Sequence, residues 1–200
     1  LLREESARIY SILENALEKA HVLQTGLQNP VLVGIPDSSH LEKIFLHTKK
    51  RLLENRISGN FHIECLPFKD LHTRLTNGSI DIVVTCGFDA DTYESPDLIT
   101  TAVPSGSYYA YMDRTNPLAG EMSVGMEDLK SSPFLVVSPM YTPAYEKLVL
   151  DLCEDAGFHP LISRYVVSPN AFICNFDTGR EVFLADAYMR ESENPVLARV

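Results

Sequence analysis

The chain has 200 residues, of which 45% are hydrophobic and 22% are charged, a composition typical of a globular protein with a buried core. Its formal net charge of -10 argues against direct nucleic-acid binding by this polypeptide, because such binding needs clustered Lys and Arg side chains. The basic cluster Lys49-Lys50-Arg51 lies in a predicted amphipathic helix and is interpreted as a solvated face. No apolar run approaches the roughly 20 residues of a membrane span, so no membrane association is expected.

The first predicted element is a helix over residues 1–28. Two series of residues repeat every seven positions along it: Leu2, Ile9, Ala16 and Leu23, and Ser6, Leu13, Ala20 and Leu27. This a/d spacing is typical of a helix that pairs with another helix, so we predict a linker helix that dimerises. The alternative is a helix that packs on its own domain. The chain starts without methionine and within this helix, which indicates a fragment of a longer protein.

Strands and helices alternate in the next part of the chain. Three apolar runs predict buried strands: VLVGI at 31–35, FHIECL at 61–66 and IDIVVT at 80–85. Amphipathic stretches between them predict a helix over 38–55, with Ser39 and Glu42 spaced as a capping box, and a short helix over 69–78. This order of elements predicts a mainly parallel sheet with right-handed crossovers.

A second set of elements begins near Leu98. The predicted strands cover residues 98–103, 107–112, 134–138, 161–168 and 181–185. Thr142, Pro143 and Gly157 mark the cap, first turn and exit of a helix, and shorter helices are predicted at 126–130 and after Ser168-Pro169. We therefore predict an α/β fold with two Rossmann-like lobes, in which residues 29–103 and 185–200 form lobe I and residues 104–184 form lobe II.

Short polar residues follow four of the predicted strands. They are Ser38 and Ser39, Thr85 and Cys86, Ser138 with Tyr141 and Thr142, and Ser168 with Asn170. Ligands of open α/β sheets bind beyond the carboxyl ends of strands, where helix N-termini favour a carboxylate or phosphate. The same residues are also common as plain helix caps, so each position has two interpretations. Their recurrence at strand ends favours a ligand cleft between two lobes.

No pattern in the chain indicates catalysis, a metal ion or a cofactor. The sequence has no Gly-x-Ser-x-Gly, Gly-x-x-x-x-Gly-Lys, His-Glu-x-x-His or Gly-x-Gly-x-x-Gly motif. His40 and His47 are about 10 Å apart along a predicted helix, too far to bind one metal ion. The four cysteines lack Cys-x-x-Cys spacing, and Cys65 and Cys86 fall in predicted strands, so we predict buried free thiols in a reducing, cytoplasmic compartment.

The order of these features resembles a known family. A heptad helix is followed by a strand and helix, by LTNGSIDIVV at 75–84, by NPLA at 116–119 and by EDLKSSPFLVV at 127–137. This order is similar to the linker helix and effector-binding domain of LysR-type transcriptional regulators, over essentially the whole chain. The fold that the resemblance implies is that of the type 2 periplasmic binding proteins.

The resemblance implies a function and a set of site residues. A winged helix-turn-helix, missing from this chain, would bind DNA, and the heptad helix would join chains into a homodimer or tetramer. A small-molecule effector, expected to be an organic or amino acid anion, would bind between the lobes. The residues implied to line the cleft are Ser38, Ser39, Thr85, Cys86, Ser138, Tyr141 and Thr142.

One loop departs from the family pattern. Regulators of this kind often have a Gly-x-Gly-Ile turn before a late strand, whereas this chain has Gly179 followed by Arg180. Arg180 is interpreted either as a contact for an anionic effector or as a surface arginine. Two other classes of function remain as alternatives: a solute-binding protein of a transport system, and an enzyme on the same fold. The absence of catalytic motifs disfavours the enzyme.

Overall fold

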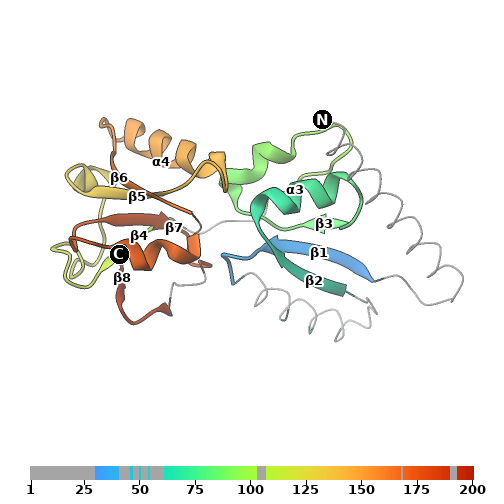
Figure 1. The fold of residues 1–200 in the computed structure, drawn as a ribbon, viewed down its shortest axis with the longest axis horizontal. Helices are drawn as coiled ribbons and strands as arrows, with labels where there is room; N and C mark the ends of the chain where they lie inside the picture. Colours follow the sequence, from blue (N-terminus) through green and yellow to red (C-terminus); the bar gives the residue numbers. More distant parts are fainter. Residues whose placement is uncertain are drawn as a thin grey trace, which may run out of the picture. The chain divides into compact units, whose positions relative to one another are not determined.

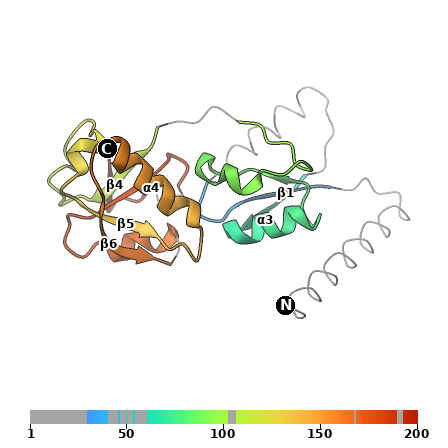
Figure 2. The same ribbon diagram turned by 90° about the horizontal axis from the view of Figure 1, so that it is seen from above.

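The structure is a computed structural model that describes residues 30–40, 46, 50, 54, 61–102, 107–167, 169–189 and 193–200. The chain divides after Thr85 into two compact units, each with its own sheet (Figures 1 and 2). The predicted linker helix 1–28 and nearly all of the predicted helix 38–55 lie outside the described residues. Pairing through the heptad helix therefore remains a prediction.

The first unit is built on a three-stranded parallel sheet. Its strands are β1 (Val31–Pro36), β2 (Phe61–Leu66) and β3 (Ile82–Val83), in the order β2-β1-β3. The three predicted strands and their parallel pairing are confirmed. β3 is shorter than predicted, although hydrogen bonds from Asp81 N to Leu32 O (2.9 Å) and from Val84 N to Gly34 O (3.0 Å) extend its contact with β1.

Helix α3 (Phe68–Thr76) packs closely on β1, and Gly34 makes this possible. A Cβ atom at position 34 would lie 2.6 Å from Leu71 Cδ2 and 2.7 Å from Ile80 Cδ1, and both of those side chains are buried. The helix ends where Asn77 is followed by Gly78, whose φ of 75° is in the left-handed region that favours glycine. The predicted helix end is confirmed.

The second unit is built on a five-stranded mixed sheet in the order β6-β5-β7-β4-β8. Its strands are β4 (Tyr109–Asp113), β5 (Pro133–Val137), β6 (Leu161–Val166), β7 (Val182–Ala185) and β8 (Leu197–Arg199). β5 runs parallel to β6 and β7, whereas β4 runs antiparallel to β7 and β8. The strand predicted at 98–103 is wrong for its described part, because Leu98 closes a turn on Ser95 and Ile99 is 98% exposed.

The described residues of this unit also form one α-helix and three 3-10 helices. They are α4 (Pro143–Asp155), η1 (Gly87–Tyr93), η2 (Met126–Leu129) and η3 (Pro169–Asn175). The predicted helix at 142–157 is confirmed, and Gly157, with φ of 81°, follows its end. The two shorter predicted helices are present as the 3-10 helices η2 and η3. η1 was not predicted.

An aromatic cluster forms the centre of the second unit. The Phe183 ring in β7 stacks on Phe172 of η3, with 4.4 Å between centroids, and on Tyr145 of α4, at 5.4 Å. Tyr111 of β4 meets the Phe172 ring edge-on at 6.5 Å. All four side chains are buried, and burial of each contributes about 1.5–3 kcal/mol. This cluster fixes η3 and the first turn of α4 to the sheet.

The observed division differs from the predicted lobes. Mutual hydrogen bonds between Ala110 and Val200, of 2.9 and 3.1 Å, continue the pairing of β8 with β4. The last strand therefore belongs to the sheet of the second unit, whereas the prediction placed 185–200 in lobe I. The predicted crossing near residue 103 falls at 103–106, outside the described residues, so the lobe boundaries remain a prediction.

The cysteines differ in part from the prediction. None of the four forms a disulfide, and all four lie in the described part of the chain. Cys65 lies in β2 as predicted but is exposed, because β2 is at the edge of its sheet. Cys86 is half-buried and precedes η1 instead of ending a strand. The predicted burial is therefore wrong for Cys65.

Candidate functional site

The topology of the second unit brings several polar residues to one edge of its sheet. β5, β6 and β7 are parallel, so their last residues lie at the same edge, which we call the carboxyl edge. β4 runs the opposite way, so Tyr108, which precedes it, also lies there. The opposite side, where β7 begins and β4 ends, is the amino edge. Ligands of open α/β sheets bind at the carboxyl edge.

The loop after β5 turns tightly into α4. Ser138 N donates to Val166 O (2.8 Å), and Ser138 O accepts hydrogen bonds from Tyr141 N (2.8 Å) and Thr142 N (3.2 Å). The Ser138 hydroxyl accepts from Met140 N at 3.3 Å. The structure thus brings the predicted residues Ser138, Tyr141 and Thr142 together at the N-terminus of α4.

Thr142 occupies the N-cap position of α4 without acting as a side-chain cap. Its backbone is extended, and its hydroxyl makes no capping hydrogen bond. The residue is 2% exposed, and its Oγ1 has no hydrogen-bond partner among the described residues. A buried hydroxyl without a partner costs about 1–3 kcal/mol. Such a group at a helix N-terminus is suited to bind a polar ligand atom.

Aromatic side chains line the start of α4. Tyr145, in its first turn, is buried and donates its hydroxyl to Leu184 O at 2.7 Å. Burial raises the pKa of this phenol, and proximity to Tyr108 raises it further. Phe88 of η1 meets the Tyr145 ring edge-on, with 5.8 Å between centroids. Phe88 and Tyr108 therefore lie beside the helix N-terminus.

Asp186, the first residue after β7, places a carboxyl group at the same edge. Its Oδ1 accepts a hydrogen bond from Tyr188 N (2.8 Å), and the Cys86 thiol donates to its Oδ2 at 3.9 Å. Burial raises the pKa of Asp186, and hydrogen bonds from Tyr188 N, Met189 N and the thiol only partly offset that effect. The predicted site residue Cys86 therefore lies beside a half-buried carboxyl group.

Tyr108 belongs to the same group of residues. Burial raises the pKa of its phenol, and electrostatic interactions with Cys86 and Asp186 raise it further. Neither Tyr108 nor Asp186 is among the site residues predicted from the sequence. The rule that selected Ser138, a polar residue at the end of a buried strand, also applies to Asp186 after VFLA.

The remaining predicted residues lie in the first unit. Ser38 and Ser39 follow β1 and are buried, and Ser39 N donates to Pro36 O at 3.2 Å. Thr85 follows β3 and is half-buried. β1 and β3 are parallel, so these three residues lie at the carboxyl edge of the first sheet. Their contact with a ligand remains a prediction.

The loop that departs from the family pattern lies at the amino edge, because it precedes β7. Gly179 has φ of 68°, and a Cβ there would be 2.7 Å from Thr115 Oγ1. The buried Glu181 carboxylate accepts hydrogen bonds from Thr178 N at 3.2 and 3.1 Å. Arg180 is exposed at this edge, which favours its interpretation as a surface arginine.

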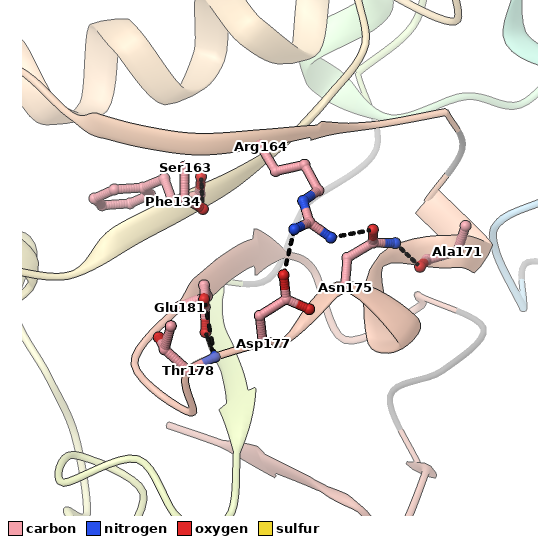
Figure 3. Close-up of polar contacts among 8 residues, drawn as sticks. All are labelled: Phe134, Ser163, Arg164, Ala171, Asn175, Asp177, Thr178 and Glu181. Carbon is pink, nitrogen blue, oxygen red and sulfur yellow. Dashed lines mark hydrogen bonds and ion pairs between the residues drawn. The ribbon is translucent and has the colours of Figure 1, made fainter.

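Arg164 joins β6 to the segment that leads into this loop (Figure 3). Its Nη1 donates to Asn175 Oδ1 at 3.2 Å, and its Nη2 forms an ion pair with Asp177. Asn175 in turn donates to Ala171 O at 2.7 Å, within η3. These polar side chains bond to one another, so the network holds η3 to β6.

Two α/β units with polar residues at the carboxyl edges of their sheets define a small-molecule-binding domain. The chain belongs to the LysR substrate binding domain family, which matches residues 26–196. The resemblance to LysR-type transcriptional regulators and the two-lobed α/β fold are thereby confirmed. The family favours a regulator over a transport protein or an enzyme. No curated protein matches the sequence.

Solved structures of LysR family regulators share the fold. CbnR matches with a TM-score of 0.70 at 14% identity, over 98% of this chain and 66% of that chain, and full-length CbnR complexed with its target DNA also gives 0.70. The effector binding domain of QuiR in complex with shikimate gives 0.67 at 12% identity, over 87% of this chain and 80% of that one. A C206 mutant of Corynebacterium glutamicum OxyR gives 0.69 at 19% identity, over 92% and 57%.

The chain shares the fold of these regulators at low sequence identity and spans part of their length. The identities are below 25%, so the structural likeness concerns the fold alone. The chain spans 66% of CbnR and 57% of OxyR, so the activity of the whole protein belongs to the proposal that follows. Within the described residues, no helix has the length and apolar character needed to cross a bilayer.

Proposed function

We propose that this chain is the effector-binding region of a LysR-type transcriptional regulator and that it binds a small organic or amino acid anion. The observation that carries the proposal is the buried Thr142 hydroxyl, which has no partner among the described residues and lies at the N-terminus of a 13-residue helix. The helix dipole favours a negative group at this point. The QuiR domain, which shares the fold, holds shikimate, a small carboxylate.

We place the proposed ligand contacts in the second unit because of the positions of its polar and aromatic residues. The Thr142 hydroxyl and the start of α4 bind the anionic group, while Ser138 and Tyr141 lie in the same turn. Phe88 and Tyr145 supply the apolar surface that most small-molecule sites contain. Ser38, Ser39, Thr85 and Cys86 are proposed as further contacts, on the basis of their positions at strand ends.

Ligand binding controls the regulator by shifting it between two arrangements. A ligand can shift such an equilibrium only by its difference in affinity for the two states. A winged helix-turn-helix outside this chain binds DNA in the cytoplasm, and the heptad helix joins chains into a homodimer or tetramer. CbnR, which shares the fold, has been observed with its target DNA.

A thermal-shift screen of this chain against small carboxylates, including shikimate and amino acids, tests the proposal. A ligand at about 100 times its Kd stabilises the folded state by about 2.7 kcal/mol, which raises the Tm by roughly 5–11 °C for a chain of this size. Thr142→Val should abolish the shift without unfolding the chain. Thr115→Val, which changes a threonine at the amino edge, is the matched control and should keep it. Absence of any shift in the wild-type chain would contradict effector binding.

A further inference from the structure

Asp186 is a carboxyl group at the carboxyl edge to which the described residues supply no positively charged partner. Its hydrogen-bond donors are Tyr188 N, Met189 N and the Cys86 thiol, and all three are neutral groups. No Lys, Arg or His side chain in the described part of the chain forms an ion pair with it. Because the carboxyl group is half-buried, its ionised form lacks part of the stabilisation that water gives.

Two other carboxylates of this unit do have a cationic partner. Asp177 pairs with Arg164, and Asp151 pairs with Lys147 at 2.6 Å. Both of those carboxylates are more exposed than Asp186, so water stabilises their negative charge more than it stabilises that of Asp186. A cation brought by a ligand would supply at Asp186 the positive charge that the described residues do not.

Two tyrosines that interact with Asp186 have accessible side chains. Tyr108 is 41% exposed and close enough for the Asp186 charge to raise its pKa. Tyr188 is 43% exposed and is held by its backbone hydrogen bond to Asp186 Oδ1. The faces of tyrosine rings attract ammonium groups, and this attraction is stronger where water is partly excluded. The surroundings of Asp186 thus suit a cation.

A simple anion would be disfavoured at this position. Two carboxylates at close range repel each other, and partial burial strengthens that repulsion. The N-terminus of α4, in contrast, favours a negative group. The same edge of one sheet therefore offers one place for a negative group, near Thr142, and another for a positive group, near Asp186.

We infer that Asp186 is a specificity-determining residue and that the ligand is a zwitterion of the amino acid class, with its carboxylate at the start of α4 and its ammonium group at Asp186. This inference rests on the proposed function and narrows its ligand class. A charge-assisted hydrogen bond between Asp186 and the ammonium group distinguishes an amino acid from a carboxylic acid that lacks the amino group.

The test measures the affinity ratio between paired probes by thermal shift on this chain. Each standard L-amino acid is paired with the acid that lacks only its amino group, such as L-phenylalanine with phenylpropanoate, and shikimate is added as an acid without an amino group. The variants are Asp186→Asn and Asp186→Ser, which both keep an acceptor for Tyr188 N. Asp113→Asn is the matched control, since Asp113 accepts the same local bond from Thr115 N (2.8 Å) at the amino edge.

In the wild-type chain and in Asp113→Asn, the amino acid that binds should bind about tenfold or more tightly than its paired acid. In Asp186→Asn and Asp186→Ser that ratio should fall close to one. A purely structural role of Asp186 would weaken both probes equally and leave the ratio unchanged, which would overturn the inference.

The other outcomes separate this inference from the proposed function. Binding of shikimate or other acids as tight as that of amino acids would overturn the role of Asp186 and leave effector binding intact. Absence of any binding to the wild-type chain would overturn both. An affinity ratio that falls only in the Asp186 variants supports both.

Discussion

The two edges of the five-stranded sheet use the same kinds of polar residue in different ways. At the amino edge, Glu181 accepts hydrogen bonds from Thr178 N, and Asp113 accepts bonds from Thr115 N and from its hydroxyl, at 2.8 and 2.6 Å. At the carboxyl edge, the buried Thr142 hydroxyl has no partner among the described residues, and the hydrogen bonds to Asp186 only partly offset its burial.

The pKa values of the carboxyl groups follow the same division. Burial works against ionisation of Glu181, yet hydrogen bonds from its own N-H and from Thr178 and Arg180 hold its pKa below the usual range. Hydrogen bonds from Thr115 lower the pKa of Asp113, whereas burial raises that of Asp186. We therefore interpret a polar residue as structural where hydrogen bonds within the protein outweigh its burial, and as a candidate ligand contact where they do not.

The largest expected effect is at the amino edge. Glu181→Ala removes a buried acceptor of several backbone N-H groups, so the free energy of unfolding should fall by about 2 kcal/mol and the Tm by roughly 4–8 °C. Urea unfolding measures the change, and ligand affinity should stay at the wild-type value. A loss of ligand affinity together with stability would show that the two edges are not separate in function.

Thr142→Val should act in the opposite direction on stability. The substitution removes a buried hydroxyl that has no described partner and keeps the β-branched shape, so the free energy of unfolding should rise by about 1 kcal/mol. Urea unfolding of this variant is compared with that of Thr115→Val, which loses a hydroxyl bonded to Asp113 and should be slightly less stable than wild type. Destabilisation by Thr142→Val would mean that its hydroxyl has a partner within the protein.

The pH dependence of stability should differ in sign between the two carboxyl groups. The lowered pKa of Glu181 gives the wild type extra stability above about pH 4, relative to Glu181→Gln, which is lost as the pH falls through the folded pKa. The raised pKa of Asp186 destabilises the wild type relative to Asp186→Asn as the pH rises above that range. Thermal unfolding between pH 3 and pH 7 would reveal both trends, and trends of the same sign would contradict the comparison.

The smallest effect is expected from the exposed ion pair of Figure 3. Arg164 and Asp177 have side chains that are 46% and 52% exposed, so water screens their attraction. Arg164→Gln should lower the free energy of unfolding by less than about 1 kcal/mol and leave ligand affinity unchanged. A change in affinity measured by thermal shift would show that the amino edge contributes to the ligand site through η3.

The sequence predicts the strands and α-helices well where the hydrophobic pattern has one interpretation. The run FLVV is buried throughout in β5, and Pro143 and Gly157 mark the limits of α4. The strand at 98–103 is predicted from the local run LITTAV, and such a run forms a strand only when a neighbouring strand pairs with it. The described part of that segment has no such partner, and Ile99 faces solvent.

The candidate site could be predicted only in part. Polar residues at strand ends identify Ser138 and Thr142, because the position of a strand end follows from local sequence. The group of Cys86, Tyr108 and Asp186 joins residues up to 100 positions apart, and the pairing of β4 with β7 brings two of them together. No local pattern contains that pairing. Whether a hydroxyl finds a partner also depends on packing, so the state of Thr142 could not be read from the sequence.

The hydroxyl of Thr142 also bears on laboratory evolution of this domain. A library selected only for heat resistance or high expression would enrich substitutions that replace a buried, unsatisfied polar group with an apolar one. Apolar substitutions of Thr142 would be among the first stabilising changes selected. The enriched clones would be well folded but would not respond to an effector. Stabilised versions of such a sensor should therefore be selected under alternating pressure for stability and for response.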